Sequence, residues 1–174
     1  MRTTTRAVAS ALLAAALLGY GAGAGAWSDQ LSPKDNVNTN CHFEPEAQCS
    51  WYLAQDADLS GKDLRHISFA SARLDRANLK GTNLAHANFQ LASLEGADLT
   101  LANLEGAHLH GVNLRGANLT MTNLKGVNLL DADLSGSNLR GANLKGAILI
   151  KARLDHATWT DGRTCAAGSV GECL

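Results

Sequence analysis

The sequence predicts an all-β solenoid, in which residues 57–161 form short units that wind into a coil. Three features lead to this fold class. A large apolar residue returns every five positions, from Leu59 to Trp159, through 21 consecutive units. A small or β-branched residue, Ala in 14 units, stands two positions before 20 of these 21 centres. Asn or Asp directly precedes the centre in 14 units, and Gly stands two positions after it in 10.

A period of five residues fits neither a simple helix nor a flat strand. Steps of five advance about 140° on a helix, so the large apolar residues would scatter around all its sides. On a flat strand they would alternate between opposite faces. They all point inward only if the backbone turns within each unit, and Gly, Asn and Asp favour such turns. The chain therefore closes into a coil.

The units resemble those of the pentapeptide-repeat family throughout 57–161, as in ADLTLANLEGAHLHGVNLRGANLT from Ala97 to Thr120. This resemblance implies a right-handed quadrilateral β-helix in which four units make one coil, and about five coils in all. Phe69 and Phe89, the only internal centres that are not Leu, are four units apart and would then stack. Lys62 occupies an inward position that is otherwise small or β-branched, which predicts an imperfect or open first coil.

Residues 1–26 have the pattern of a secretory signal peptide. Arg2 and Arg6 precede an apolar run from Ala7 to Leu18, and small residues follow up to Ala26. Cleavage after Ala26 or Ala24 fits this pattern. A retained membrane anchor is the alternative, but the apolar run is short for a bilayer. We therefore expect a secreted or periplasmic protein with no membrane span after cleavage.

The segments on either side of the repeats, 27–56 and 162–174, each contain two of the four cysteines. An even number of cysteines after a signal peptide favours disulfides over metal ligation, since neither pair has the short spacing of zinc sites. Four cysteines allow three pairings, but the two pairs would lie at opposite ends of the solenoid, too far apart to cross-link. We expect Cys41–Cys49 and Cys165–Cys173, each closing a cap, with Trp51, Tyr52 and Trp159 covering the ends.

The sequence contains no recognisable catalytic motif, and we expect neither an enzyme nor a bound cofactor. His66 and His86, also four units apart, would stack at a corner and are weak candidates for metal ligands. Two histidines make an incomplete zinc site, so exposed corner side chains are the simpler interpretation and no metal is expected.

Charge argues against a nucleic-acid partner and against DNA mimicry. The chain has a net charge of −1, and the repeats contain 11 basic and 10 acidic residues. The best-known members of the family are acidic, dimeric, cytoplasmic proteins that act on DNA gyrase by mimicking duplex DNA. Mimicry requires a strongly negative surface. A DNA mimic that interacts with topoisomerase is therefore an alternative that the charge and the signal peptide disfavour.

Several apolar residues occupy positions that should face outward, and exposed apolar patches often mark contacts. They form the candidate interaction surface: Leu91, Leu101, Met121, Leu130, Ile148 and Ile150. The tail after Trp159 could fold back over Leu130, Ile148 and Ile150. A partner, a second copy in a homodimer, or simple scatter are the other interpretations.

These observations predict a non-enzymatic scaffold that binds an unidentified protein or envelope component. A module that binds envelope carbohydrate is a further alternative. The sequence does not identify the partner, and the repeat pattern by itself describes a scaffold.

Overall fold

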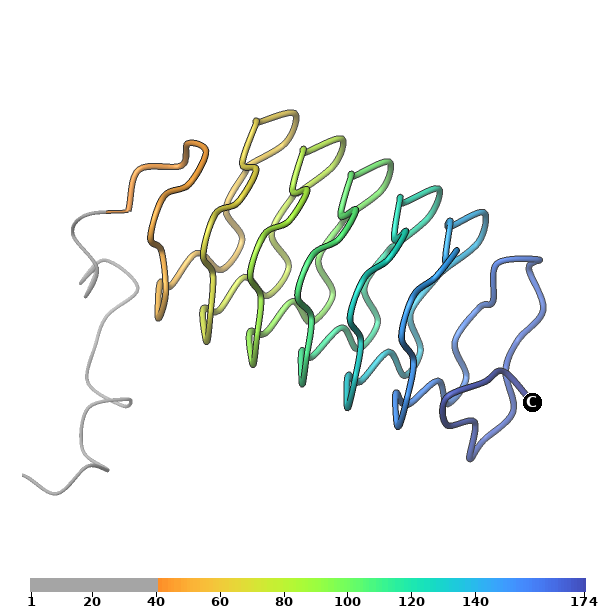
Figure 1. Ribbon diagram of the computed structural model, residues 1–174. Helices are drawn as coiled ribbons and strands as arrows, with labels where there is room; N and C mark the ends of the chain where they lie inside the picture. Colours follow the sequence, from red (N-terminus) through yellow and green to blue (C-terminus); the bar gives the residue numbers. More distant parts are fainter. Residues whose placement is uncertain (1–40) are drawn as a thin grey trace, which may run out of the picture. The chain divides into compact units, whose positions relative to one another are not determined.

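The computed structural model describes residues 41–174, and within them the chain forms a stack of coils (Figure 1). The predicted signal peptide and the segment 27–40 lie outside the described residues. No helix and no continuous strand occurs in 41–174; turns alternate with single bridged residues. No helix of these residues is long and apolar enough to cross a membrane.

Parallel bridges join residues that are always 20 positions apart, from Gln48–Ser68 to Asn138–Thr158. The expected coil of four units is therefore the repeating element. The bridges form four ladders, which we call faces A to D. Face A contains Asp58, Asn78, Asp98, Asn118, Asn138 and Thr158; face B contains Asp63, Asn83, Asn103, Asn123 and Asn143. Face C contains Gln48, Ser68, Asn88, His108, Asn128 and Ile148; face D contains Leu53, Arg73, Ser93, Asn113, Asp133 and Arg153.

Each unit uses its backbone in the same way. The Leu99 N–H donates to the Asn118 carbonyl of the next coil at 2.8 Å, and the Asn118 N–H donates back to Ala97 at 2.9 Å. A turn then closes with the Ala102 N–H donating to Leu99 at 3.0 Å. The coil can therefore repeat without continuous strands, because every unit pairs with the next coil and then changes direction.

Asparagine is favoured before the centre because its side chain bonds in two directions. The Asn103 Oδ1 accepts the backbone N–H of Glu105 at 3.2 Å, which supports the local turn. The Asn123 Nδ2 donates to Asn103 Oδ1 at 2.9 Å, and the Asn103 Nδ2 donates to Asn83 at 3.2 Å. Face B is thus tied together by side chains as well as by backbone.

The core is the column of centres together with the small residues two positions earlier. Nearly all of these side chains are fully buried, and Phe69 and Phe89 stack with ring centroids 5.3 Å apart. Each buried Leu contributes about 1.5–3 kcal/mol. Inward Thr82 and Thr122 remain compatible with this core because their hydroxyls donate to Leu59 and Leu99 carbonyls at 3.0 and 2.8 Å.

Lys62 does not distort the coil. Its carbonyl accepts the Asn83 N–H at 2.9 Å, as in regular units, while its side chain is exposed. This is possible because face B begins at Asp63, so no bridged residue precedes this unit in its column among the described residues. The first coil is open beneath Lys62, and its backbone is regular.

The first cap continues the coil. The Cys41–Cys49 disulfide forms as expected, and Gln48 and Leu53 already pair in parallel with Ser68 and Arg73. Residue 57, where the repeat pattern starts, is therefore not a change in backbone path. The expectation that Trp51 covers this end is wrong: it lies at a corner with φ 62° and is 71% exposed. The covering ring is Phe43, which packs edge-on to Tyr52 at 5.3 Å.

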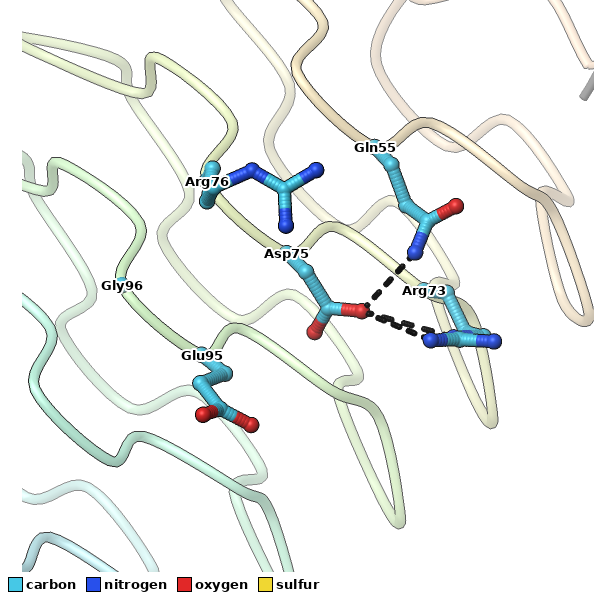
Figure 2. A pocket seen from close by; sticks show the side chains of 6 residues that line it. All are labelled: Gln55, Arg73, Asp75, Arg76, Glu95 and Gly96. Atoms are coloured by element: carbon cyan, nitrogen blue, oxygen red, sulfur yellow. Dashed lines mark hydrogen bonds and ion pairs between the residues drawn. The ribbon is translucent and has the colours of Figure 1, made fainter.

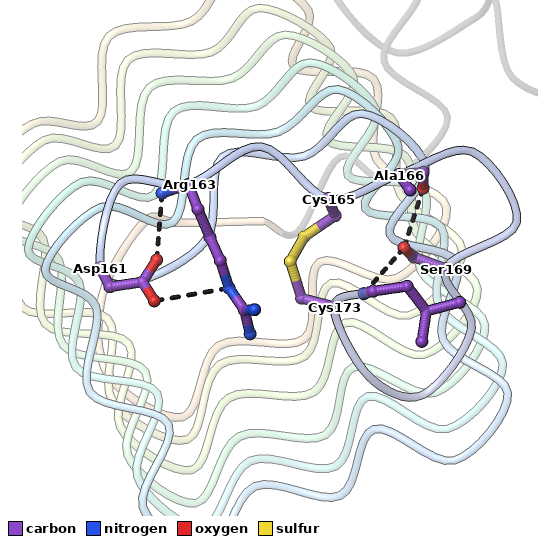
Figure 3. The surroundings of a disulfide bond; sticks show 7 residues. Asp161, Arg163, Cys165, Ala166, Ser169 and Cys173 are labelled. Carbon is purple, nitrogen blue, oxygen red and sulfur yellow. Dashed lines mark hydrogen bonds and ion pairs between the residues drawn. A yellow bond between two sulfur atoms is a disulfide. The ribbon is translucent and has the colours of Figure 1, made fainter.

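The last cap reverses direction. Thr164 pairs antiparallel with Thr158, and Val170 with Arg153. The expected Cys165–Cys173 disulfide forms and is buried, lying centrally over the end of the stack (Figure 3). Trp159, partly buried, packs against the core near this end, as expected.

Candidate functional site

The corners of the coil display part of the candidate interaction surface. A corner residue stands two positions after each centre from Leu59 to Leu154 and has φ near +60°, whether or not it is glycine. Leu101 and Met121 occupy the corner between faces A and B, one coil apart, at φ 60° and 57°. They are 60% and 62% exposed. They therefore form a short apolar ridge along that corner.

The other predicted surface residues lie on face C and at its corner with face D. Leu91 occupies that corner with φ 58° and is 61% exposed. Ile148 and Ile150 flank the centre Leu149 and are 45% and 62% exposed, whereas Leu130 is half-buried. The six predicted residues thus form two separate surfaces on opposite sides of the stack.

The C-terminal tail does not cover Ile148 and Ile150. It pairs with residues of faces A and D instead, where Leu154 donates to the Ser169 carbonyl at 2.9 Å and Trp159 to Arg163 at 2.7 Å. The idea that the tail folds back over this patch is therefore wrong. The tail reverses along the last coil because its antiparallel bonds satisfy that edge.

Four bulky corner residues, Arg76, His86, Leu91 and Met121, are followed 20 positions later by glycine, a signal that the sequence contains but that a count of single units misses. A Cβ built on Gly141 would lie 2.9 Å from Met121 Sδ, and one on Gly111 would lie 2.8 Å from Leu91 Cδ2. His86 approaches Gly106 in the same way. The side chains therefore lie along the corner over the glycine of the next coil.

The two stacked histidines come together as expected, with ring centroids 5.2 Å apart and planes inclined by 16°. Among the described residues no group of three His, Cys, Asp or Glu side chains could hold a metal ion. Two imidazoles on one corner do not complete a zinc site. Their arrangement follows from the length of the coil.

A polar pocket of about 400 Å³ lies on face D and was not predicted (Figure 2). It is lined by Gln55, Arg73, Asp75, Arg76, Glu95 and Gly96. Figure 2 shows Gln55 and Arg73 directed at the Asp75 carboxylate, and both donate to it at 3.2 Å. Grouping residues by 20 would have found it, since Gln55, Asp75 and Glu95 are successive members of one column.

Asp75 is the buried centre of this pocket. Burial alone would raise the pKa of its carboxyl, but hydrogen bonds from Ser93, Gln55 and Arg73 outweigh it and hold the pKa below its ordinary value. Arg76 is paired with Asp56 at 2.7 Å. The charges of the pocket are therefore satisfied within the chain, and the network ties together three coils rather than presenting an unpaired group to a ligand.

Comparisons with known proteins agree with this architecture. The sequence profile described as "Pentapeptide repeats" matches residues 55–90, 92–129 and 128–158 in eight copies. No curated protein matches the chain.

Similar solved structures include two pentapeptide-repeat proteins. A pentapeptide-repeat protein from the thylakoid lumen of Arabidopsis thaliana is 31% identical with a TM-score of 0.53, covering 68% of this chain and 85% of its own. The pentapeptide-repeat protein Rfr23 from the cyanobacterium Cyanothece 51142 is 28% identical with a TM-score of 0.51, covering 66% and 89%. Such proteins form right-handed quadrilateral β-helices, in keeping with the parallel ladders found in this chain.

Proposed function

The chain belongs to the pentapeptide-repeat family, and on this premise we propose that it is a non-catalytic, secreted or periplasmic scaffold that binds a protein or envelope component. Members of this family are generally structural or interaction proteins, and neither solved relative indicates catalysis. The proposal includes the expected stack of about five coils for residues 57–161, which small-angle scattering of the purified protein would test.

The observation that carries the proposal is the exposure of bulky apolar side chains at corners where glycine would be less strained. Left-handed backbone costs a non-glycine residue about 1–2 kcal/mol, and Leu101 and Met121 adopt it while remaining more than half exposed. Glycine occupies the equivalent position in 10 of the 21 units. Their side chains therefore bring little burial in return for the strain.

A contact with a partner would explain this cost. Leu101 and Met121 rise side by side along one corner, so a partner could bury both at once. Burial of two such side chains contributes about 3–5 kcal/mol, which is enough to offset the backbone strain of about 2–4 kcal/mol at the two residues. Strained residues that local structure does not require often occur at functional sites.

The compartment is inferred from two independent features. Residues 1–26 have the signal-peptide pattern, and all four cysteines form disulfides at the two ends of the stack. Disulfides persist in oxidising compartments such as the periplasm or the extracellular space. A similar protein occurs in the thylakoid lumen, which is consistent with this fold functioning outside the cytosol.

The test of binding uses glycine substitutions, because they remove the apolar side chains without threatening the fold. Leu101→Gly with Met121→Gly should leave the melting temperature unchanged or slightly higher, since both corners are left-handed. The matched control is Lys151→Gly, which relieves the same backbone strain at φ 58° but removes a charged side chain.

The three proteins are cross-linked in intact producing cells, and cross-linked species are identified by mass spectrometry. We expect one species with the wild type and the Lys151→Gly variant, and its loss with the double variant. Capture of the same species by all three proteins would show that Leu101 and Met121 do not contact the partner. Cell fractionation with N-terminal sequencing tests the compartment, and recovery of an uncleaved chain in the cytosol would refute export.

A further inference from the structure

Face C differs from the other three faces in its charge. The outward positions of a face stand one residue before and one residue after each centre. None of the twelve outward positions of face C, from Gln48 to Ile150, is Asp, Glu, Lys or Arg, whereas seven of the twelve on face D are. Faces A and B carry four charged residues in twelve positions and five in ten. The repeat therefore accepts charge at these positions, and the coil itself does not require a neutral face C.

The corners beside face C extend this uncharged area. The corner between faces B and C carries no charged residue from His66 to Gly126, counting His as neutral, and the corner between faces C and D carries none from Trp51 to Gly111. We call face C from Gln48 to Leu130, together with these two stretches of corner, the neutral surface.

Two asparagines of the neutral surface have amide groups that are held in place but unused. The Oδ1 atoms of Asn88 and Asn128 accept the backbone N–H of Gln90 and Leu130 at 3.0 and 3.1 Å. Their Nδ2 atoms make no hydrogen bond among the described residues. An amide N–H that has no partner in the chain is available to a ligand.

The contrast with face B explains why these amides are unused. On face B an unbroken run of asparagines passes each Nδ2 to the Oδ1 of the coil before it, as Asn123 does to Asn103 at 2.9 Å. On face C the residues that precede Asn88 and Asn128 in the ladder are Ser68 and His108. The interruption of the asparagine run therefore leaves donors on face C that face B consumes internally.

Apolar side chains lie beside these amides, along the corner between faces C and D. Trp51 and Leu91 are 71% and 61% exposed, and they stand two coils, or about 10 Å, apart. Both have left-handed backbone, at φ 62° and 58°, which costs a residue other than glycine about 1–2 kcal/mol. The neutral surface thus combines an exposed indole and an exposed leucine with oriented amide donors.

The chemistry of this surface selects an uncharged partner. A charged group would lose its water at the neutral surface without gaining an ionic contact, which is unfavourable. A sugar polymer without carboxylates or phosphates has no such cost. Its hydroxyl oxygens accept hydrogen bonds from the amides, and the C–H face of a sugar ring packs on an aromatic ring such as that of Trp51.

The arrangement of the two columns also favours a linear polymer. Asn88 and Asn128 are two coils apart in one ladder, and Trp51 and Leu91 are two coils apart in the neighbouring corner. Both columns run along the stack. A chain that lies in this direction meets amides on one side and apolar side chains on the other.

We propose that the neutral surface binds an uncharged glycan chain of the cell envelope, laid along the stack. The inference rests on the proposed export and identifies the chemical class of the envelope component. It does not depend on Leu101 and Met121, which lie at the corner between faces A and B. The glycan and the partner of that ridge therefore occupy different surfaces.

Binding of the purified, oxidised protein to defined hexasaccharides tests the proposal. The neutral probes are the β-1,4 and α-1,4 hexamers of glucose and the β-1,4 hexamer of N-acetylglucosamine, and the acidic probe is the hexamer of galacturonic acid. We expect calorimetry to detect binding of at least one neutral probe and none of the acidic one. Binding of no neutral probe, or preference for the acidic one, would overturn the proposal.

A double variant tests the amides. Asn88→Asp with Asn128→Asp keeps the acceptor that supports each turn, as Asp98 does on face A, but it removes both donors and adds charge. The dissociation constant for the neutral probe should rise about tenfold or more.

The matched control makes the same change on another face. Asn118 and Asn138 on face A also accept a backbone N–H through Oδ1, at 3.2 and 3.1 Å. Asn118→Asp with Asn138→Asp should therefore bind the probe as the wild type does. An equal loss of affinity in both double variants would overturn the placement of the glycan on face C.

A corner substitution tests the indole independently of the amides. Trp51→Gly should weaken binding by about tenfold, because the ring no longer covers the sugar. Lys151→Gly, in the same corner column and with the same left-handed backbone, should not change it. Wild-type affinity in both Trp51→Gly and the aspartate variant of face C would overturn the proposal.

The ridge variant separates this inference from the proposed protein contact. Leu101→Gly with Met121→Gly should bind the hexasaccharide like the wild type, even though it loses the cross-linked species. Failure of the ridge contact would leave glycan binding intact, and failure of glycan binding would leave the cross-linked species intact. Loss of hexasaccharide binding in the folded ridge variant would overturn the assignment to the neutral surface.

Discussion

The two ends of the stack are both capped, but the chain pairs in parallel with the coil at the first end and antiparallel to it at the last. Both have a disulfide that joins cysteines eight positions apart, with Cα atoms 4.9 Å apart. At the first end the chain enters the coil in the direction in which it continues, so Gln48 already pairs in parallel with Ser68. At the last end the chain reverses, so Val170 pairs antiparallel with Arg153.

The difference follows from what each end must cover. The first cap puts Cys49 in a centre position, fully buried in the core, with the Phe43 ring 6.3 Å from that of Phe69. The last cap covers the end of the core and the edges of two faces, and leaves the other two edges open. At the first end the cap therefore continues the parallel pairing of the coil. At the last end the reversing tail is long enough to pair with only two of the four faces.

Truncation of a core centre on face C should give the largest difference in stability between the two ends. Phe69→Ala should lower the free energy of unfolding by about 3–5 kcal/mol, because the ring is fully buried between Phe43 and Phe89. Leu149→Ala, at the open end and only partly buried, should cost roughly half as much. Urea titration measures both, and Phe69→Leu is the control at less than about 1.5 kcal/mol. Equal losses would mean that face C is closed at both ends.

Removal of either disulfide should lower the free energy of unfolding by a similar amount, but only removal of the second should also loosen the tail. Both bridges close loops of the same length, so Cys41→Ala with Cys49→Ala, and Cys165→Ala with Cys173→Ala, should each cost about 2–3 kcal/mol. Loss of the second bridge should also free the tail, and hydrogen exchange should rise at the Leu154 and Trp159 amides that bond to it. Unchanged protection there would show that the antiparallel bonds hold the tail without the bridge.

Acid should destabilise the coil near both ends, because it protonates the buried Asp75 and the partly buried Asp133. The pKa of Asp75, near the first end, and of Asp133, near the last, are both held below the ordinary value, since hydrogen bonds and nearby arginines outweigh burial. Their contribution is present above the unfolded pKa of about 3.9 and is lost as pH falls through the lower folded pKa. Asp75→Asn and Asp133→Asn should each flatten the fall in melting temperature below about pH 4. A slope identical to that of the wild type would assign acid sensitivity to other groups.

Substitution of the corner residues at the two ends should have the smallest effect. Trp51→Gly and Lys151→Gly both relieve left-handed backbone, at φ 62° and 58°. Each should change stability by less than about 1 kcal/mol, because the relief of strain offsets the flexibility of glycine in the unfolded chain. A loss of about 2 kcal/mol or more in Trp51→Gly alone, seen by thermal melting, would show that this side chain covers the first end after all.

Much of the architecture could be predicted from the sequence because it is local and repeated. Leu at every fifth position requires a turn in each unit. The Asn that precedes it supports this turn by accepting a backbone N–H, as Asn103 does from Glu105. The stacking of Phe69 on Phe89 and of His66 on His86 follows from a coil of four units. The two disulfides followed from the expected separation of the ends.

The remaining features depend on residues that meet only in the folded coil. The Asp75 network joins Gln55, Arg73 and Ser93, which lie 2 to 20 positions from Asp75 and come together only because the 20-residue coil places them side by side. The exposure of Lys62 depends on the absence of a bridged unit before it, and that of Trp51 on its corner position.

The sequence by itself thus determined the coil and its core, because a five-residue period allows few backbone paths. The direction of the tail was decided only by tertiary structure. Residues 162–174 carry no repeat, and their path depends on the unpaired groups of the last coil, which exist only once that coil has formed. The same folded edge decides which groups of faces B and C remain open.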